Sequence, residues 1–308
     1  MSHQPLNVLS VDVEDYHDQL ALDFQDRIIP PRAEAERCTD RLLELFAEYD
    51  VKGTFFILGE MAEHFGALIR RIADEGHQLG VHGYYHLHTF RQTPREFRTS
   101  LERAKKLIED VSGKQADAHR AVAFSINTMS ETTWAMDVLA DVGFAYDSSV
   151  FPIRGRRYGS PDAPRGPYRH ALSDGRSIWE IPLSTMVRWG RRWPVGGGGY
   201  LRLFPRAVTD RALRRLNDDG LGMVVYLHPY EVEPNPRIEP LRGLSLKRRC
   251  HFAFFNFQQV RLRRTVIPKL RHLLSRYRFG TIDQAVAELT AAGTPVPTWT
   301  FPACPATP

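Results

Sequence analysis

Apolar and polar residues alternate along the first half of the chain in blocks, and the period within each block distinguishes strands from helices. Apolar residues recur every three to four positions over residues 33–49 and again over residues 60–76, which predicts two helices. Short, continuously apolar runs predict buried strands at residues 6–11, 52–58 and 77–81. Repeated strand–helix units indicate an α/β fold built on a parallel sheet or barrel.

The same alternation continues to about residue 147 and returns in the last third of the chain. A helix over residues 93–111 is marked by Thr93 as its N-cap, Pro94 in its first turn and Glu96 three positions after the cap. Residues 151–199 are rich in Gly, Pro and Arg, which predicts long loops and short strands. The remaining predictions are strands near 118–123 and 222–227 and helices over 131–142, 205–219 and 261–277.

This order of elements predicts one large domain. We expect residues 1–292 to form it, with a core at about 6–235 and an extension at about 236–292 folded onto that core. The last segment, 293–308, is rich in Pro and Thr and is predicted to be a disordered or loosely packed tail.

Composition narrows the class of protein further. With 308 residues, 43% of them hydrophobic, the chain can bury a large core without disulfides. The cysteines Cys38, Cys250 and Cys304 lie far apart and form no CxxC pair, which argues against a disulfide framework or a cysteine zinc site and favours a reducing compartment. No signal peptide or transmembrane segment is indicated at the N-terminus, so we expect a cytoplasmic location.

Positive charge is concentrated in one part of the chain. The net charge is +5 and the isoelectric point about 9.2. Residues 237–278 contain about a dozen Lys and Arg and almost no acids. This segment is interpreted either as a solvated basic helix face or as a contact for an anionic polymer or membrane surface. Nucleic acid is not expected as a partner, because no RNA-binding or zinc-finger signature accompanies the charges.

The candidate chemistry lies at the ends of two predicted strands. Asp12, Glu14 and Asp15 end the first strand, and the third strand leads into His82 and, four positions on, His86. Two histidines at this spacing share one face of a helix. A carboxylate and two imidazoles form the mixed ligand set of a catalytic zinc-type site, and a spare carboxylate could take a proton from the bound water. Acidic residues at strand ends are also frequent helix caps, so this pattern alone leaves the carboxylate ligand open.

Six motifs in a fixed order extend this pattern over about residues 6–290. They are Ser10-Val11-Asp12-Val13-Glu14-Asp15, Gly53-Thr54-Phe55-Phe56, Gly80-Val81-His82-Gly83-Tyr84-Tyr85-His86, Arg120-Ala121-Val122-Ala123-Phe124, Tyr146-Asp147-Ser148-Ser149 and Leu227-His228-Pro229-Tyr230-Glu231. Together they resemble the polysaccharide deacetylases of carbohydrate esterase family 4, the NodB-homology group. The extra C-terminal region makes the chain most similar to the branch linked to exopolysaccharide loci.

The resemblance implies a fold and a reaction. The fold would be a distorted (β/α) barrel of about seven parallel strands with a C-terminal extension packed on it. The reaction would be metal-dependent hydrolysis of N-acetyl groups from an amino-sugar polysaccharide or its oligosaccharide precursor, with release of acetate. The divalent metal would be Zn first, with Co, Ni, Fe or Mn as alternatives. Two other functions stay open: hydrolysis of another C–N bond, such as a formamide or cyclic amide, and non-catalytic sugar binding in a polysaccharide export system.

The resemblance also assigns roles to residues. Asp12 matches the family's catalytic base, Arg120 the arginine that holds the base in place, and His228 the general acid. The family's metal-binding histidines match His82 and His86.

The metal carboxylate is either Glu14 or Asp15. Many family members have two adjacent aspartates at this position, whereas Val13 follows Asp12 in this chain. Strand alternation places Asp12 and Glu14 on the same side, which favours Glu14 over Asp15.

The substrate groove is expected to differ from the usual family pattern. Val122 stands where the family has a proline, whose fixed φ normally shapes that turn. Aromatic side chains are the candidates for stacking on sugar rings. The predicted substrate-binding residues are Tyr84, Tyr146 and Trp193, with Trp179, Trp189 and Tyr200 as further candidates.

Overall fold

A parallel sheet forms the centre of the molecule. The computed structural model describes residues 4–155, 159–236, 238–239, 241 and 243–302. The strands pair in the order β10-β1-β2-β3-β4-β5-β7-β6-β12, and the first seven in this path run parallel to their neighbours. These seven are β10 (Val224–Leu227), β1 (Asn7–Val13), β2 (Thr54–Ile57), β3 (Gln78–Val81), β4 (Ala116–His119), β5 (Tyr146–Asp147) and β7 (Ser177–Glu180). The predicted α/β class is confirmed; among the described strands, no pairing closes the path into a ring.

In the described part of the chain, five further strands lie outside this parallel series. β6 (Tyr168–Ala171) pairs antiparallel with β7, and β12 (Thr298–Trp299) pairs with β6 at the edge of the sheet. β11 (Phe279–Gly280) pairs with the start of β1. A separate hairpin consists of β8 (Thr185–Arg188) and β9 (Arg191–Pro194). The predicted irregular region 151–199 is therefore mostly short strands and turns.

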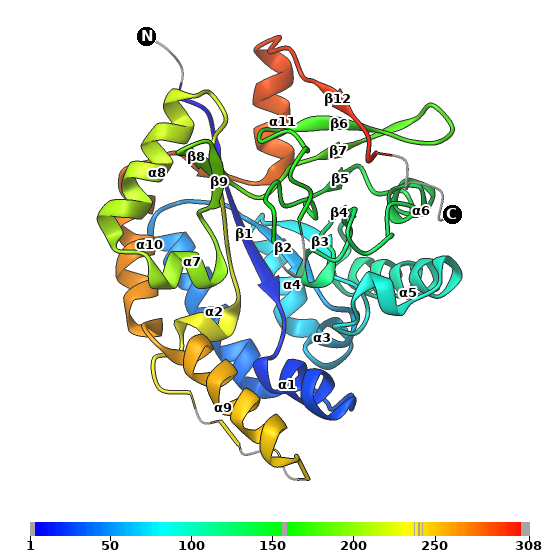
Figure 1. Ribbon diagram of the computed structural model, residues 1–308, viewed down its shortest axis with the longest axis vertical. Helices are drawn as coiled ribbons and strands as arrows, with labels where there is room; N and C mark the ends of the chain where they lie inside the picture. Colours follow the sequence, from blue (N-terminus) through cyan, green and yellow to red (C-terminus); the bar gives the residue numbers. More distant parts are fainter. Residues whose placement is uncertain (1–3, 156–158, 237, 240, 242, 303–308) are drawn as a thin grey trace.

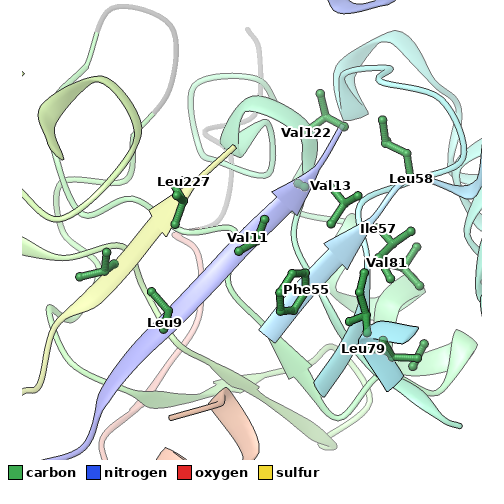
Figure 2. Close-up of a cluster of buried hydrophobic side chains, with 14 of the residues drawn as sticks. Leu9, Val11, Val13, Phe55, Ile57, Leu58, Leu79, Val81, Val122 and Leu227 are labelled. Carbon is green, nitrogen blue, oxygen red and sulfur yellow. The ribbon is translucent and has the colours of Figure 1, made fainter. Parts of the chain in front are cut away.

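β1 is buried along its whole length, which explains its apolar run. Its odd-numbered residues Leu9, Val11 and Val13 pack with side chains from β2, β3 and β10 in one cluster, as Figure 2 shows. Because side chains alternate along a strand, Ser10 and Asp12 point to the opposite side. Hydrophobic burial on the first side therefore fixes which side the polar residues of β1 face.

Helices surround the strands, and Figure 1 shows α7, α8 and α10 on one side of β1 and α5 and α6 on the other. The predicted capping box of α5 is present: the Thr93 side chain accepts a hydrogen bond from the Glu96 amide, and Glu96 in turn accepts one from the Thr93 amide. The α-helices are α1 (Tyr16–Gln25), α2 (Ala33–Glu48), α3 (Gly59–His64), α4 (Gly66–Asp74), α5 (Pro94–Ser112), α6 (Ala135–Val142), α7 (Gly198–Leu203), α8 (Arg206–Asp218), α9 (Leu246–Val260), α10 (Val266–Leu274) and α11 (Ile282–Ala291).

Several predicted boundaries were wrong. The helix expected over 60–76 is two helices, α3 and α4, that meet at Phe65. The strand expected over 118–123 ends at His119, because the chain turns there into a 3₁₀ turn, Val122–Phe124, in which Ala123 and Phe124 have positive φ. The helix expected over 261–277 begins only at Val266. Three of the described helices, α1, α7 and α9, had not been predicted.

The C-terminal tail was also predicted wrongly in its first part. β12 pairs with β6, and the Phe301 ring lies 5.0 Å from that of His170 and is buried. Apolar burial therefore holds residues 298–301 against the sheet edge, while residues 303–308 lie outside the described part of the chain. In the described residues, no helix combines the length and apolar character needed to span a bilayer.

Candidate metal and catalytic site

The predicted site residues follow, or lie near, the C-terminal ends of four parallel strands. Glu14 comes directly after β1, His82 after β3, Arg120 after β4 and His228 after β10, and Asp12 is next to last in β1. In parallel α/β folds these strand ends meet at one edge, so residues far apart in sequence come together. The structure brings all five into contact with one another or with common partners.

Glu14, His82 and His86 form a compact buried cluster. Their ligand atoms all lie within 4.8 Å of one another, and Glu14 Oε2 is 2.9 Å from His86 Nε2 and 3.7 Å from His82 Nε2. Both Glu14 oxygens are buried and have no hydrogen-bond donor in good geometry. Two imidazoles and a carboxylate left without a partner suit a divalent transition metal.

The second nitrogen of His82 fixes its orientation. The Nδ1 atom lies 2.7 Å from the Arg120 carbonyl oxygen, which can only accept a hydrogen bond. Nδ1 must therefore carry the proton, and Nε2 is left with a lone pair facing Glu14. This is the tautomer that a metal ligand requires.

The expected helical arrangement of His82 and His86 was wrong. The chain bends at residues 84–86 instead of forming a helix, and Gly83 has a φ of +93°. A side chain at this position would be strained in the left-handed region, so glycine allows the sharp reversal that returns His86 to the end of β3. The four-residue spacing therefore works through a loop.

Asp15 lies outside the metal cluster. Its side chain caps α1, with Oδ1 accepting a hydrogen bond from the His17 amide at 2.8 Å and Oδ2 accepting one from the Arg32 amide. Both carboxylate oxygens are thus engaged by backbone donors. Of the two carboxylates left open by the sequence, only Glu14 has oxygens directed at both histidines.

Burial and charge act against each other on Glu14. Burial raises the pKa of its carboxyl, but the His86 and His228 imidazoles outweigh this and hold the pKa well below its usual value. The carboxylate form expected of a metal ligand is therefore the stable one.

Asp12 is held by Arg120 in a buried ion pair. Asp12 Oδ1 lies 2.7 Å from Arg120 Nη1, and the Arg120 side chain is completely buried. The same guanidinium donates to the Ser10 hydroxyl and to the Ser148 hydroxyl and carbonyl oxygen, and lies 4.2 Å above the Phe56 ring. Arg120 therefore fixes the position of Asp12, and the second Asp12 oxygen, Oδ2, faces His228 Nε2 at 3.9 Å.

His228 is positioned by residues of its own motif. Its Nδ1 lies 3.3 Å from Glu231 Oε2, and its ring stacks on Tyr230 with centroids 5.0 Å apart and planes 6° from parallel. Glu231 is held in turn by Arg202 of α7. Burial lowers the pKa of His228, but the Glu14, Glu231 and Asp12 carboxylates outweigh it and raise the pKa to about 9.

Sequence reasoning did not single out the residues that support His228. The Glu231 contact follows from its place three residues after His228, with Pro229 between them in a capping box, and this spacing could have been recognised. Arg202 lies 29 residues from Glu231, and no local pattern links the two.

One cavity of about 360 Å³ contains this machinery. Besides Asp12, Glu14 and the three histidines, its lining includes Tyr200, Tyr226 and, from α9, Gln258 and Gln259. A second cavity of about 930 Å³ shares Gln19, His86, Ala123 and Gln259 with the first. The C-terminal extension therefore forms part of the wall of the site.

The three aromatic residues predicted to bind substrate line neither cavity. Tyr84 is buried, with its hydroxyl donating to Glu63 and its ring 3.7 Å from the Arg103 guanidinium. Tyr146, in β5, packs against a second cluster of buried hydrophobic side chains, separate from the one around β1, and Trp193 is half-exposed on β9. Among the further candidates, Tyr200 does line the cavity with the catalytic residues.

Comparison with known proteins agrees with this site. The family model for polysaccharide deacetylase matches residues 15–144, and the model of a domain of unknown function, DUF3473, matches residues 148–287. The peptidoglycan deacetylase of Helicobacter pylori is 31% identical over 110 residues, which are 36% of this chain and 36% of that protein. A peptidoglycan-N-acetylglucosamine deacetylase of Bacillus cereus is 35% identical over 75 residues, 24% of this chain and 27% of that protein.

The matched stretches thus span about a quarter to a third of these curated relatives. Among solved structures, one described as a polysaccharide deacetylase of Mycobacterium smegmatis matches with a TM-score of 0.62 and 23% identity over 98% of this chain and 96% of that one. At this identity the likeness establishes a shared fold. The family model shows that the chain contains, over residues 15–144, a polysaccharide deacetylase domain of the family that the ordered motifs resemble.

Proposed function

We propose that this protein is a metal-dependent de-N-acetylase of an amino-sugar polysaccharide or its oligosaccharide precursor. The observation that supports this most is the convergence of the Glu14, His82 and His86 cluster with Asp12 and His228 in one cavity. The polysaccharide deacetylase domain supports a deacetylase, and the two curated relatives act on peptidoglycan according to their names.

The metal would be held by Glu14, His82 and His86, with Zn as the first candidate. When bound, such an ion supplies Lewis acidity: it lowers the pKa of a bound water toward about 7 and polarises a carbonyl oxygen. The buried Glu14 oxygens, which have no hydrogen-bond donor in good geometry, and the tautomer of His82 fit this role.

Asp12 is the proposed general base. Arg120 occupies one of its oxygens, so the other, Oδ2, is the one available to take the proton from the attacking water. The buried guanidinium holds the Asp12 side chain in one orientation and thereby avoids the entropy cost of positioning it at each turnover.

His228 is the proposed general acid. Glu231 contacts Nδ1, which leaves Nε2 directed toward Asp12 and Glu14. An amine leaves poorly without a proton, and Nε2 would donate that proton to the nitrogen of the broken amide bond. Asp12 and His228 thus line the same cavity, with Asp12 Oδ2 and His228 Nε2 3.9 Å apart.

The test is acetate release from a panel of N-acetylated amino-sugar oligosaccharides, using metal-free protein reloaded with Zn or Co. We expect metal-dependent release, and its loss in Asp12→Asn with metal binding retained. Absence of release from every member, with metal shown to be bound, would contradict the proposal and favour another C–N substrate or a binding role. Full turnover by Asp12→Asn would contradict the assignment of the base.

A further inference from the structure

An apolar stripe runs along the solvent side of α9. Leu246, Phe254 and Phe257 are 77%, 62% and 60% exposed, and Cys250 is exposed between them. Positions 246, 250, 254 and 257 have the spacing of one helical face. Large apolar side chains gathered on one exposed face indicate an interaction surface. We call these four residues and the basic residues beside them the α9 outer face.

Basic residues flank the stripe at both ends of the helix. Between Glu239 and Asp283 the sequence contains no acidic residue, so nothing in this segment neutralises them. The exposed basic residues of the α9 outer face are Lys247, Arg249, Arg261 and Arg264; Arg248 is also exposed but lies on the side of α9 that lines the cavity of about 930 Å³.

The positions of Lys247, Arg248 and Arg249 are unfavourable for the helix itself. They occupy the first turn of α9, after the N-cap Ser245, and no acidic residue accompanies them. The N-terminus of a helix has a partial positive charge, so cations there oppose the helix dipole. Their presence is better explained by an external anionic partner than by helix stability.

The opposite face of α9 is anchored to the protein. Phe252 and Phe255 pack against Phe24 of α1, with ring centroids 5.3 and 5.7 Å apart, and Asn256 accepts a hydrogen bond from the Tyr16 hydroxyl at 2.5 Å. Figure 1 shows α9 beside α1, at the end toward which β1 points. The outer face is therefore presented by a fixed helix next to the mouth of the site.

The helix also borders the larger cavity. Arg248, His251 and Phe255 line it, and Gln259 lines both this cavity and the catalytic one. A partner bound to the outer face would consequently lie close to the entrance used by substrate.

We propose that the α9 outer face docks the protein on an anionic lipid bilayer. The apolar stripe would enter the boundary between headgroups and acyl chains, and the flanking basic residues would bind lipid phosphates. Charge complementarity selects an anionic partner, while exposed Leu and Phe side chains select one with an apolar interior. A soluble polyanion satisfies only the first requirement. This docking goes beyond the proposed hydrolytic function and does not depend on it.

The test uses the full chain with the variant Cys304→Ser, in which Cys250 is the exposed thiol because Cys38 is buried. An environment-sensitive fluorophore on Cys250 should brighten and shift to the blue with vesicles of phosphatidylcholine and phosphatidylglycerol, and not with phosphatidylcholine alone. Unlabelled protein should sediment with the mixed vesicles, and added salt should weaken this binding.

Matched variants distinguish vesicle binding through the stripe from nonspecific binding by exposed aromatic side chains. Phe254→Ser combined with Phe257→Ser should weaken vesicle binding by at least about tenfold, because two apolar side chains no longer enter the bilayer. Trp189→Ser, at the tip of the β8–β9 hairpin, removes an aromatic side chain that is even more exposed, at 77%, and that also has arginine neighbours, Arg188 and Arg191. It should leave binding unchanged. Circular dichroism melting would establish that each variant is folded.

Three results would overturn the proposal. The first is the absence of both fluorescence change and co-sedimentation at low salt. The second is vesicle binding that survives Phe254→Ser with Phe257→Ser and is abolished by soluble heparin, which would make the face a polyanion site. The third is self-association in sedimentation velocity that this double variant removes, which would make a second copy the occupant. Acetate release from soluble oligosaccharides is measured separately, so failure of docking and failure of the hydrolase function are distinguishable.

Discussion

Replacement of Arg120 by methionine should destabilise the fold strongly, because it leaves a buried charge without its partner. Arg120 is completely buried and donates hydrogen bonds to Ser10, Asp12 and Ser148. Methionine can fill much of the volume but can donate none of these bonds. Asp12, only 2% exposed, would then lose its close ion pair and keep only the more distant His228, at 3.9 Å.

The expected cost is about 3–5 kcal/mol of unfolding free energy, the range found when one partner of a buried ion pair is removed. Part of this cost comes from the Ser148 carbonyl oxygen, because a buried acceptor that loses its donor costs about 1–3 kcal/mol. Most of the remainder should come from the Asp12 charge. If so, Asp12→Asn introduced on top of Arg120→Met should restore roughly 1–2 kcal/mol, since the buried charge is then absent.

Urea unfolding of the metal-free protein, followed by circular dichroism, measures all four members of this double-mutant cycle. Arg71→Met is the matched control, because Arg71 also forms ion pairs with carboxylates, those of Asp40 and Glu75, but is 41% exposed. Its loss should cost less than about 1 kcal/mol. The reasoning is refuted if the double variant is as unstable as the sum of the two single variants, or if Arg71→Met costs as much as Arg120→Met.

Three further predictions concern separate regions. Glu14→Gln should weaken Zn binding in calorimetry by at least about a hundredfold. Asp15→Asn should leave the Zn affinity within about threefold and cost at most about 1 kcal/mol of stability. The reverse pattern would make Asp15 the ligand. Burial lowers the pKa of His77 to about 4. Below a pH of about 6.5 the unfolded chain therefore binds a proton at this residue that the folded protein does not bind. Stability should therefore fall by up to about 3 kcal/mol as the pH drops from about 6.5 to 4, and a His77→Gln variant that shows an equally steep fall would exclude this cause. Phe301→Ser should lower the unfolding free energy by about 2–4 kcal/mol in urea titrations, and a change below about 0.5 kcal/mol would show that the tail contributes little.

The central strands and most of the candidate site could be predicted from the sequence, because a strand that is buried on both faces is a nearly continuous apolar run. β1 is apolar or functional at almost every position, and the residues next to its end are those that the site uses. Spacing alone was ambiguous, however. His82 and His86 were expected on a helix, and a glycine-dependent turn produces the same convergence.

Elements whose apolar residues show no regular period could not be predicted from the sequence. β5 and β12 have two residues each, too few for an alternation to show. α9 has apolar residues on its packed face and on its solvent face, so its pattern resembles neither a simple surface helix nor a strand. The support of His228 by Arg202 depends on packing between α7 and the end of β10, and such contacts follow only from the folded structure.

The pairing of β1 has a consequence for synthesis of the chain. Its two lateral neighbours are β2, completed at Ile57, and β10, which begins only at Val224, while β11 joins its first residues still later. A nascent or truncated chain that stops near residue 147 therefore exposes one edge of a long apolar strand, with free backbone donors and acceptors that favour aggregation. The half of the chain that matches the deacetylase model should consequently be insoluble when expressed alone, and chaperone binding during translation should concentrate on the interval before β10 emerges.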